Sequence, residues 1–405
     1  MRLSPRILLL TAFYHPFLGG VETHARELAR YLSTAGFSIT IVTKRAGRDT
    51  PIRETLDGLP VYRTHPGGAR TGLRKWLMLP FAFARIVALR TDVDLIYCPG
   101  YQGIGLAALA AGRVLRRPVV LRSGNIGVLA GGNIDAPLAR WGFSGDSVVA
   151  RQIKRLLRRV YMSAEAFACN SREIEREALE FGVGRSRVHY LPNAVDVERF
   201  RPAAPGEKDA IRRDAGWPAD ALVCLYVGRL SVEKGVMDLL QAWRELDRAA
   251  VLVLVGPDMP GNPLDAGPAA RAYAAEHRLT NVIFHGRSDD VPRLLRAADL
   301  AVQPSHYEAL SNAVIEAMAT GLPIVASRVS GMQDCLTDGY SGLLSAPQQP
   351  AELTCQLRRA IDDPALRARL GQAARTEAVQ RFSRDVVFDG FAALFRQVHA
   401  ARQAH

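Results

Sequence analysis

The sequence lacks the features that mark several common protein classes. Its five cysteines are scattered, odd in number and free of any Cys-x-x-Cys pair. Neither a disulfide framework nor a zinc site is indicated, and a reducing cytoplasm fits this cysteine usage best. No stretch reaches the roughly 18 consecutive apolar residues that a membrane-spanning helix needs. The glycine pair in "FLGGVETH" at 17–24 is neither the Gly-x-Gly-x-x-Gly dinucleotide fingerprint nor a Walker phosphate loop.

The sequence has fewer acidic residues than basic ones. The chain has 40 Asp and Glu against 52 Lys and Arg, which gives a net charge of +12. Such a charge favours contact with phosphates, nucleic acid or an anionic membrane surface, without selecting among them. The 405 residues are otherwise of ordinary globular composition, with 48% hydrophobic and 23% charged residues. At roughly 150 residues per domain, we expect two large domains.

Strand and helix patterns alternate from the beginning of the chain. An apolar run over 7–13 predicts a strand, helical spacing over 21–36 predicts a helix, and 37–45 reads as the next strand. This order predicts parallel pairing with a right-handed crossover. Further strands are expected at 94–98, 118–122 and 166–170.

The same order restarts after the Pro-rich segment 199–209. Here the expected strands are 222–230, 250–256, 281–286, 300–305 and 322–327, the expected helices are 235–247 and 291–298, and 351–405 is helical throughout. The fold class is therefore α/β, with two parallel-sheet domains facing a central cleft. Ligands of such sheets bind beyond the carboxyl ends of the strands. We place the domains at 1–198 and 199–380, with a helix over 381–405 that crosses back to the first domain.

Two glycine-containing loops that come after predicted strands have the chemistry of phosphate binding. Gly19 and Gly20 open the first helix, where free amides and the helix dipole favour an anion. Arg229 and Lys234 project from the loop "GRLSVEKG", and two cations on one loop suit a diphosphate. The alternative for the glycine pair is a simple turn. The alternative for "GRLSVEKG" is a solvated basic loop without a ligand.

A third loop, "SHYEALSNAVIEAMATG" over 305–321, has two glutamates at the start of a helix. Ser311 is expected to cap this helix, with Glu308 just before it and Glu316 in its second turn. If both glutamates were helical, they would lie about 80° apart around the axis and about 12 Å apart along it. They therefore suit the two ends of one elongated ligand. The alternative is that Glu316 is a structural or surface glutamate.

Together these loops resemble a known family. "FLGGVETH" at 17–24, "GRLSVEKG" at 228–235, "LPNAVDVERFRP" at 191–202 and the Glu-x7-Glu pattern at 308–316 look like the retaining, nucleotide-sugar-dependent glycosyltransferases of family 4, also called group 1. The resemblance extends from about residue 7 to about residue 395. It implies the GT-B fold, with an acceptor-side Rossmann-like domain followed by a nucleotide-sugar-binding one.

The resemblance also implies roles for individual residues. Arg229 and Lys234 would bind the donor diphosphate and stabilise the charge of the leaving nucleotide, and Glu308 would contact the donor sugar near the reacting centre. Glu316 would bind the ribose. Other implied donor contacts are Gly19, Gly20, the amides around Leu310, Ser311 and Asn312, and the backbone at His285.

Retention in this family is described as same-face attack without an enzyme nucleophile, and the family generally needs neither a cofactor nor a metal. The sequence "DVD" at 92–94 mimics a metal motif of another transferase fold, but it leads directly into a strand, so we interpret it as a helix–strand junction. Many relatives carry a His after the strand at 118–122. Here Arg122 and Asn125 occupy that neighbourhood, and His24 is the nearest other candidate for acceptor contact.

Two basic, amphipathic segments bear on the acceptor. Residues 71–90 mix aromatic and basic residues without an acidic one, and 151–160 place five cations on one helical face, opposite Leu156 and other apolar residues. Such helices suit an anionic membrane surface, although packing on the domain with a solvated basic face explains them too. A membrane position would make the acceptor a lipid-linked sugar, as in bacterial envelope or exopolysaccharide synthesis, on the inner face of the cytoplasmic membrane.

The sequence thus predicts a hexosyltransferase that uses a UDP- or GDP-sugar. An epimerase or phosphorylase on a similar fold is the enzymatic alternative, but such epimerases lack the paired loops and phosphorylases have a much longer chain with a pyridoxal lysine. The other alternative is a non-catalytic basic protein that binds membrane or nucleic acid. It has no need for Glu308 and Glu316, and aromatic residues interleaved for base stacking are not evident, so we expect no nucleic-acid partner.

Overall fold

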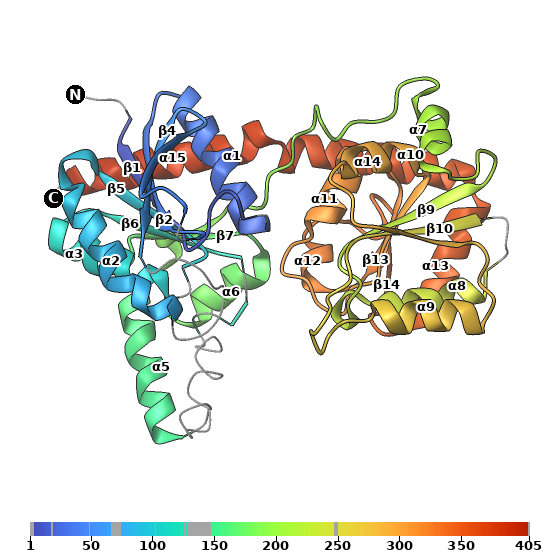
Figure 1. Cartoon of the computed structure of the whole chain (residues 1–405), viewed down its shortest axis with the longest axis horizontal. Coiled ribbons are helices and arrows are strands. Elements are labelled where there is room, and N and C mark those ends of the chain that lie inside the picture. The colour runs from blue at the N-terminus through green and yellow to red at the C-terminus, as the bar shows by residue number, and fades with distance from the viewer. Residues whose placement is uncertain are drawn as a thin grey trace. The chain divides into compact units, whose positions relative to one another are not determined.

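The computed structural model of the chain describes residues 4–17, 19–47, 49–65, 74–101, 103–124, 126, 127, 129, 147–246 and 250–403. These residues form two compact units (Figure 1). Unit 1 comprises Met1–Pro192 together with Val387–His405, and unit 2 comprises Asn193–Val386. Each unit is built on one sheet with helices on its faces. The α/β class predicted from the sequence is confirmed.

Unit 1 contains an eight-stranded sheet in the order β3-β4-β2-β1-β5-β6-β7-β8. Neighbouring strands are parallel, except that β3 and β4 form an antiparallel pair at one edge. The strands are β1 (Arg6–Leu10), β2 (Ser38–Lys44), β3 (Arg53–Leu56), β4 (Leu59–Thr64), β5 (Leu95–Pro99), β6 (Val119–Ser123), β7 (Ala166–Cys169) and β8 (Val188–Tyr190).

The helices of unit 1 follow its strands. They are α1 (Gly20–Thr34), α2 (Arg74–Ala88), α3 (Ile104–Leu115), α5 (Val148–Tyr161) and α6 (Arg172–Glu180). The last helix of the chain, α15 (Arg384–Gln403), ends in this unit and packs on it through Phe388, Phe391 and Phe395, which are buried. The ring of Phe391 lies 5.7 Å from that of Tyr97 on β5, so the aromatic face of α15 joins the core of unit 1.

Unit 2 contains a six-stranded, parallel sheet in the order β11-β10-β9-β12-β13-β14. Its strands are β9 (Leu222–Val227), β10 (Ala250–Val255), β11 (Val282–Gly286), β12 (Leu300–Gln303), β13 (Ile324–Ser327) and β14 (Leu343–Ser345). Its helices are α7 (Glu207–Ala215), α8 (Val236–Arg244), α9 (Gly267–Glu276), α10 (Val291–Ala297), α11 (Asn312–Ala319), α12 (Ser330–Gln333), α13 (Pro350–Asp362) and α14 (Pro364–Phe382).

Burial on both faces explains why the strands of unit 2 read as continuous apolar runs. On β9, Val223 and Leu225 belong to one core and Cys224 and Tyr226 to the other. Successive side chains of a strand point to opposite faces, so a sheet covered on both sides needs apolar residues at every position. Helices α10, α11 and α14 supply residues to the first core, and α8 and α13 to the second.

The strands predicted from apolar runs are confirmed, most of them shorter than predicted by a few residues. The antiparallel pair β3 and β4 was not predicted, and neither were the three-residue strands β8 and β14. Strands of three residues are too short to show a period of two, and β3 (RETL) has a polar sequence that suits an exposed edge.

The sequence "DVD" lies at a helix–strand junction, as predicted. Asp92 ends a short 3₁₀ turn (Arg90–Asp92), and Asp94 stands directly before β5. The Asp94 carboxylate accepts hydrogen bonds from the backbone amide of Arg6 at 3.0 Å and from the Arg6 guanidinium at 2.7 and 2.9 Å. This carboxylate therefore ties β1 to the entry of β5.

Replacing Asp94 tests the structural role of this pair. Hydrogen bonding to Arg6 lowers the pKa of Asp94 to about 2, so its contribution to stability is complete above the ordinary value of 3.8 and is lost as the pH falls through about 2. We expect Asp94→Asn to lower the free energy of unfolding at neutral pH by about 2 kcal/mol in urea denaturation. The control, Asp289→Asn, removes the same charge from an exposed pair with Arg287 and should change little.

Candidate active site

Three of the predicted donor residues of unit 2 lie in two loops at one edge of its sheet. The first loop follows β9 and contains Arg229 and Lys234, and the second follows β12 and contains Glu308. Because β9 and β12 are neighbouring parallel strands, both loops leave the same edge of the sheet. The carboxyl ends of parallel strands are where ligands of such sheets bind.

Glycines allow the loops to approach each other closely. Gly235 has a φ of +69°, and a Cβ there would lie 1.9 Å from the carbonyl oxygen of Pro304 in the second loop. A Cβ at Gly256, after β10, would lie 1.7 Å from the carbonyl oxygen of Gly228. Neither position has room for a side chain, so Gly235 at the end of the first loop and Gly256 against its start are required by packing.

Lys234 and Glu308 form an ion pair that joins the two loops. The side chains are 18% and 13% exposed, so the pair is largely screened from solvent. The same carboxylate oxygen of Glu308 lies 3.4 Å from the Ser305 hydroxyl, which in turn accepts from the Gln303 amide at 3.1 Å. Lys234 and Glu308 are therefore held in fixed positions, as a preorganised site requires.

Arg229 is more exposed and is paired within its own loop. Its guanidinium contacts the Glu233 carboxylate at 2.5 Å, and the two side chains are 48% and 37% exposed. The Tyr226 hydroxyl donates to the backbone carbonyl of Arg229 at 2.7 Å, and burial raises the pKa of Tyr226. Glu233 was not predicted as a site residue, although its spacing of four from Arg229 is the signal that could have found it.

The helix after the second loop begins as predicted. Ser311 is the N-cap of α11, and its hydroxyl accepts from the amide of Val314 at 3.4 Å. Leu310 and Ser311 are buried, while the Asn312 side chain accepts from Asn193 at 2.7 Å. Glu308 precedes the helix and Glu316 lies in its second turn. The structure thus brings Arg229, Lys234, Glu308 and the start of α11 to one edge of the sheet.

His285 lies in the same unit, on β11. Its ring packs edge-on against Trp217, with the centroids 5.7 Å apart. Since β11 is separated from β9 by β10, His285 does not share a loop with the two cations. Its predicted role, which is a backbone contact with the donor, stays a prediction.

Gly19 and Gly20 lie at the start of α1 in unit 1, as predicted, and both are exposed. Gly19 is the N-cap residue in an extended conformation, and its carbonyl accepts from the Thr23 amide at 2.9 Å. A Cβ at Gly19 would lie 2.4 Å from a carboxylate oxygen of Glu22. A carboxylate thus lies beside the helix start that we predicted to bind phosphate.

His24 and Arg122 are buried within unit 1, and their predicted contact with the acceptor stays a prediction. His24 is 6% and Arg122 2% exposed, and both lie against Phe391 of α15. Burial lowers the pKa of His24 well below its usual range, and the nearby Arg122 guanidinium lowers it further. The His24 ring lies 3.4 Å from the Tyr97 hydroxyl, among the buried aromatic residues of unit 1.

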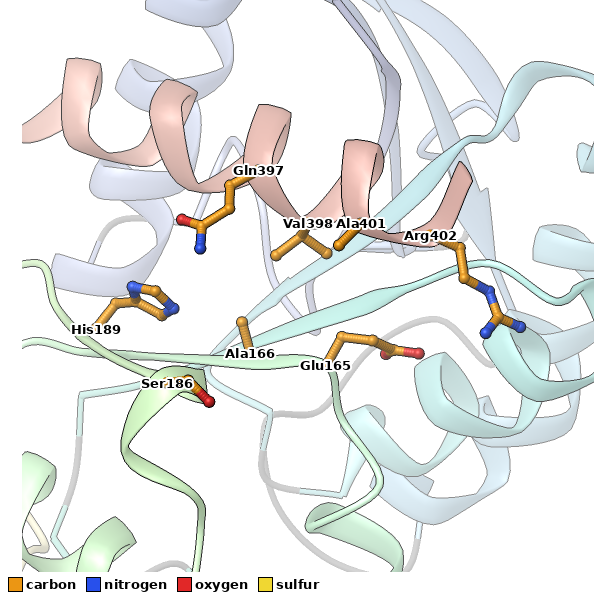
Figure 2. Close-up of a pocket in the computed structure, with 8 residues that line it drawn as sticks. All are labelled: Glu165, Ala166, Ser186, His189, Gln397, Val398, Ala401 and Arg402. Atoms are coloured by element: carbon orange, nitrogen blue, oxygen red, sulfur yellow. The ribbon is translucent and has the colours of Figure 1, made fainter. Parts of the chain in front are cut away.

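Asn125, the remaining acceptor-side candidate, lies outside the described residues. The described part of unit 1 does contain a cavity of about 260 Å³. Figure 2 shows Gln397 and Arg402 of α15 on one side of it and Glu165 and His189 on the other. Because Glu165 directly precedes β7, this cavity lies at the amino edge of the sheet, and none of the predicted site residues lines it.

Neither a metal site nor a membrane span is found in the part of the chain that the structure describes. Among these residues, no cluster of three or more His, Cys, Asp or Glu side chains is arranged to hold a metal ion. Within the same ranges, no helix combines the length and the apolar character needed to cross a membrane.

Both units match known protein families. Residues 207–377 match the family described as Glycosyl transferases group 1, and residues 19–194 match the Glycosyl transferase 4-like domain. D-inositol 3-phosphate glycosyltransferase 1 of Catenulispora acidiphila is 31% identical over 369 residues, which cover 86% of this chain and 83% of that protein. Glycogen synthase of Mycobacterium tuberculosis is 27% identical over 426 residues, which cover 98% of this chain and 94% of that protein.

Solved structures also match this chain in fold. The structure of Anabaena Alr3699/HepE in complex with UDP and glucose has a TM-score of 0.75 at 22% sequence identity, and the match covers 96% of this chain and 99% of that one. At this identity the likeness concerns the fold.

Gly331 offers a test of the backbone around Glu308. Its amide donates to the Glu308 carbonyl at 3.1 Å, and a Cβ at Gly331 would lie 2.5 Å from that oxygen. We expect Gly331→Ala to displace the second loop and to lower the free energy of unfolding by about 2 kcal/mol. Urea denaturation measures this, with Gly47→Ala as the control because its nearest atom would be 3.9 Å away. Equal stability of the two variants would contradict the close approach.

Proposed function

The chain belongs to the group 1 glycosyltransferases with the GT-B fold, and from this membership we propose that it is a retaining, metal-independent hexosyltransferase. It transfers a sugar from a UDP- or GDP-sugar to a hydroxyl of a lipid-linked glycan, in the synthesis of a bacterial envelope polysaccharide or exopolysaccharide. The observation that carries the donor part of this proposal is the meeting of Arg229, Lys234 and Glu308 at the carboxyl edge of the sheet of unit 2.

The two cations would stabilise the leaving group. Cleavage of the bond between the sugar and the diphosphate leaves negative charge on the phosphate oxygens, and fixed cations beside these oxygens lower the barrier. Lys234 is held in place by Glu308, while the planar guanidinium of Arg229 can bind two oxygens at once. HepE, which shares this fold, has been solved in complex with UDP and glucose, and this supports a nucleotide-sugar donor.

Glu308 would orient the sugar rather than attack it. One of its oxygens is engaged by Lys234 and lies near Ser305, which fixes the carboxylate so that it can accept hydrogen bonds from sugar hydroxyls. In the proposed reaction, the acceptor hydroxyl forms the new bond to the anomeric carbon on the face from which the diphosphate leaves. The acceptor proton passes to a diphosphate oxygen, so no enzyme nucleophile is needed.

The start of α11 would hold the rest of the donor. Its first amides are available to phosphate oxygens beyond the bond that Ser311 makes with Val314. Glu316, one turn further along the helix, would accept hydrogen bonds from the ribose. The donor would then extend along the helix start from Glu308 at the sugar to Glu316 at the ribose.

Helix α5 supports a membrane-bound acceptor. It has no acidic residue and five cations, which are Arg151, Lys154, Arg155, Arg158 and Arg159. Figure 1 shows α5 extending away from the sheet of unit 1. Only Ala150 and Tyr161 of this helix are fully buried, so most of its length is not part of the core. A long basic helix of this kind suits the surface of an anionic leaflet.

Exposed apolar residues accompany these cations. Val148 and Leu156 on α5 are 64% and 62% exposed, so Leu156 does not pack against the domain, as the packing alternative for this helix would require. Ile153 and Leu157 do pack, against Ala150. On α2, Leu77 and Phe81 are also about half exposed. Apolar side chains among cations are what binding to the interface of a membrane requires.

The donor proposal predicts the effect of two substitutions. Transfer or hydrolysis should be detected with one member of a panel of UDP-, GDP- and ADP-sugars, and Lys234→Ala and Glu316→Ala should each reduce turnover by about 100-fold or more. Arg287→Ala, which removes an exposed cation from the same unit, serves as the control. Undiminished activity of both site variants would refute the site assignment.

The membrane proposal predicts selective binding to anionic vesicles. The protein should sediment with vesicles that contain phosphatidylglycerol and not with pure phosphatidylcholine. Leu156→Asp should weaken this binding about tenfold, because it removes an inserted side chain and adds a repelled charge. Ile52→Asp is the control, since Ile52 is an exposed apolar residue of the same unit on another segment. Equal binding to both vesicles would contradict the proposal.

A further inference from the structure

Each of the two cations in the candidate donor site has a carboxylate partner. Lys234 is paired with Glu308, and Arg229 with Glu233. The formal charges of these four side chains cancel. A diphosphate that enters the site therefore meets a neutral cluster, and it gains the full attraction of the cations only if a carboxylate moves away.

The two pairs differ in the ease with which they can separate. Lys234 and Glu308 are less than one-fifth exposed and join two loops, whereas Arg229 and Glu233 are 48% and 37% exposed and lie four residues apart in one loop. Exposed pairs contribute little stability, because water solvates both charges when the pair opens. The Arg229 pair is thus the one that an incoming anion can exchange at low cost.

The backbone of Glu233 would not have to move in this exchange. Glu233 lies in a 3₁₀ turn (Val232–Lys234), and its carbonyl accepts from the His306 amide at 2.9 Å. The His306 ring is fixed in turn by Asp238 of α8, at 2.6 Å. The loop is anchored while the Glu233 carboxylate reaches solvent, so a change of rotamer suffices to release Arg229.

We propose that Glu233 is a competing anion of the donor site. Its carboxylate pairs with Arg229 while the site is empty, gives way to the diphosphate of the donor, and pairs with Arg229 again as the nucleoside diphosphate leaves. Glu233 thereby limits the affinity for the product and speeds its release. This inference rests on the proposed function, because it requires that Arg229 binds a diphosphate.

The test measures the affinity for nucleoside diphosphate by titration calorimetry. UDP, GDP and ADP are first compared with the unmodified protein, and the tightest binder is then used with Glu233→Gln. We expect this variant to bind about two- to fivefold more tightly at low salt, with a smaller difference at high salt. In turnover assays, its product inhibition should strengthen by the same factor.

A matched variant separates the local effect from the change in net charge. Glu245→Gln removes the same charge from an exposed pair with Arg244 at the far end of α8, where the contact is 2.8 Å. Its affinity should equal that of the unmodified protein.

The outcomes distinguish the two proposals. Unchanged or weaker binding by Glu233→Gln would overturn the inference, since Glu233 would then position Arg229 rather than compete for it. The same tightening in Glu245→Gln would overturn it as well. Failure of the unmodified protein to bind any of the three nucleotides would instead refute the proposed donor site.

Discussion

The parallel pairing of β9 with β12 is the constraint on which the candidate site depends. Leu300 lies opposite Cys224 and Ala301 opposite Leu225, although β10 and β11 separate the two strands in the sequence. Since parallel strands end at the same edge, the loops after Val227 and Gln303 must meet there. The site is thus assembled by the burial of apolar strands, and the charged residues are carried to it by the sheet.

Once the strands are paired, glycines in the loops determine how closely the loops approach each other. The missing side chains of Gly235, Gly256 and Gly331 leave space that neighbouring carbonyl groups occupy. A larger residue at any of these positions would move the loop that contains Arg229 or Glu308. Ion pairs are sensitive to such shifts, because a displacement of about 1 Å changes both the hydrogen bond and its direction. The exact positions of the charged side chains therefore depend on uncharged glycines.

Much of this arrangement could be predicted from local sequence, because it depends on local rules. Apolar runs identified the strands, and Ser311 was recognisable as a helix cap from its type and position. Contacts between residues distant in sequence could not be derived in this way. Lys234 and Glu308 meet because of the strand order, and His24 packs against Phe388 and Phe391, which come from near the other end of the chain. A pattern of helical spacing shows that one face is buried but not which element buries it.

The difference in exposure between the two cations is a consequence of the same architecture. Lys234 ends a turn that packs against the second loop, so its charge and that of Glu308 are withdrawn from water and held in place. Arg229 leaves the strand earlier, and its guanidinium contacts the exposed carboxylate of Glu233 and the sulfur of Met259. Fixed charges favour a transition state because they need no reorganisation, whereas a product is released quickly only from contacts that water can replace. One loop of eight residues, 228–235, thus contains both a rigid cation and an exchangeable one.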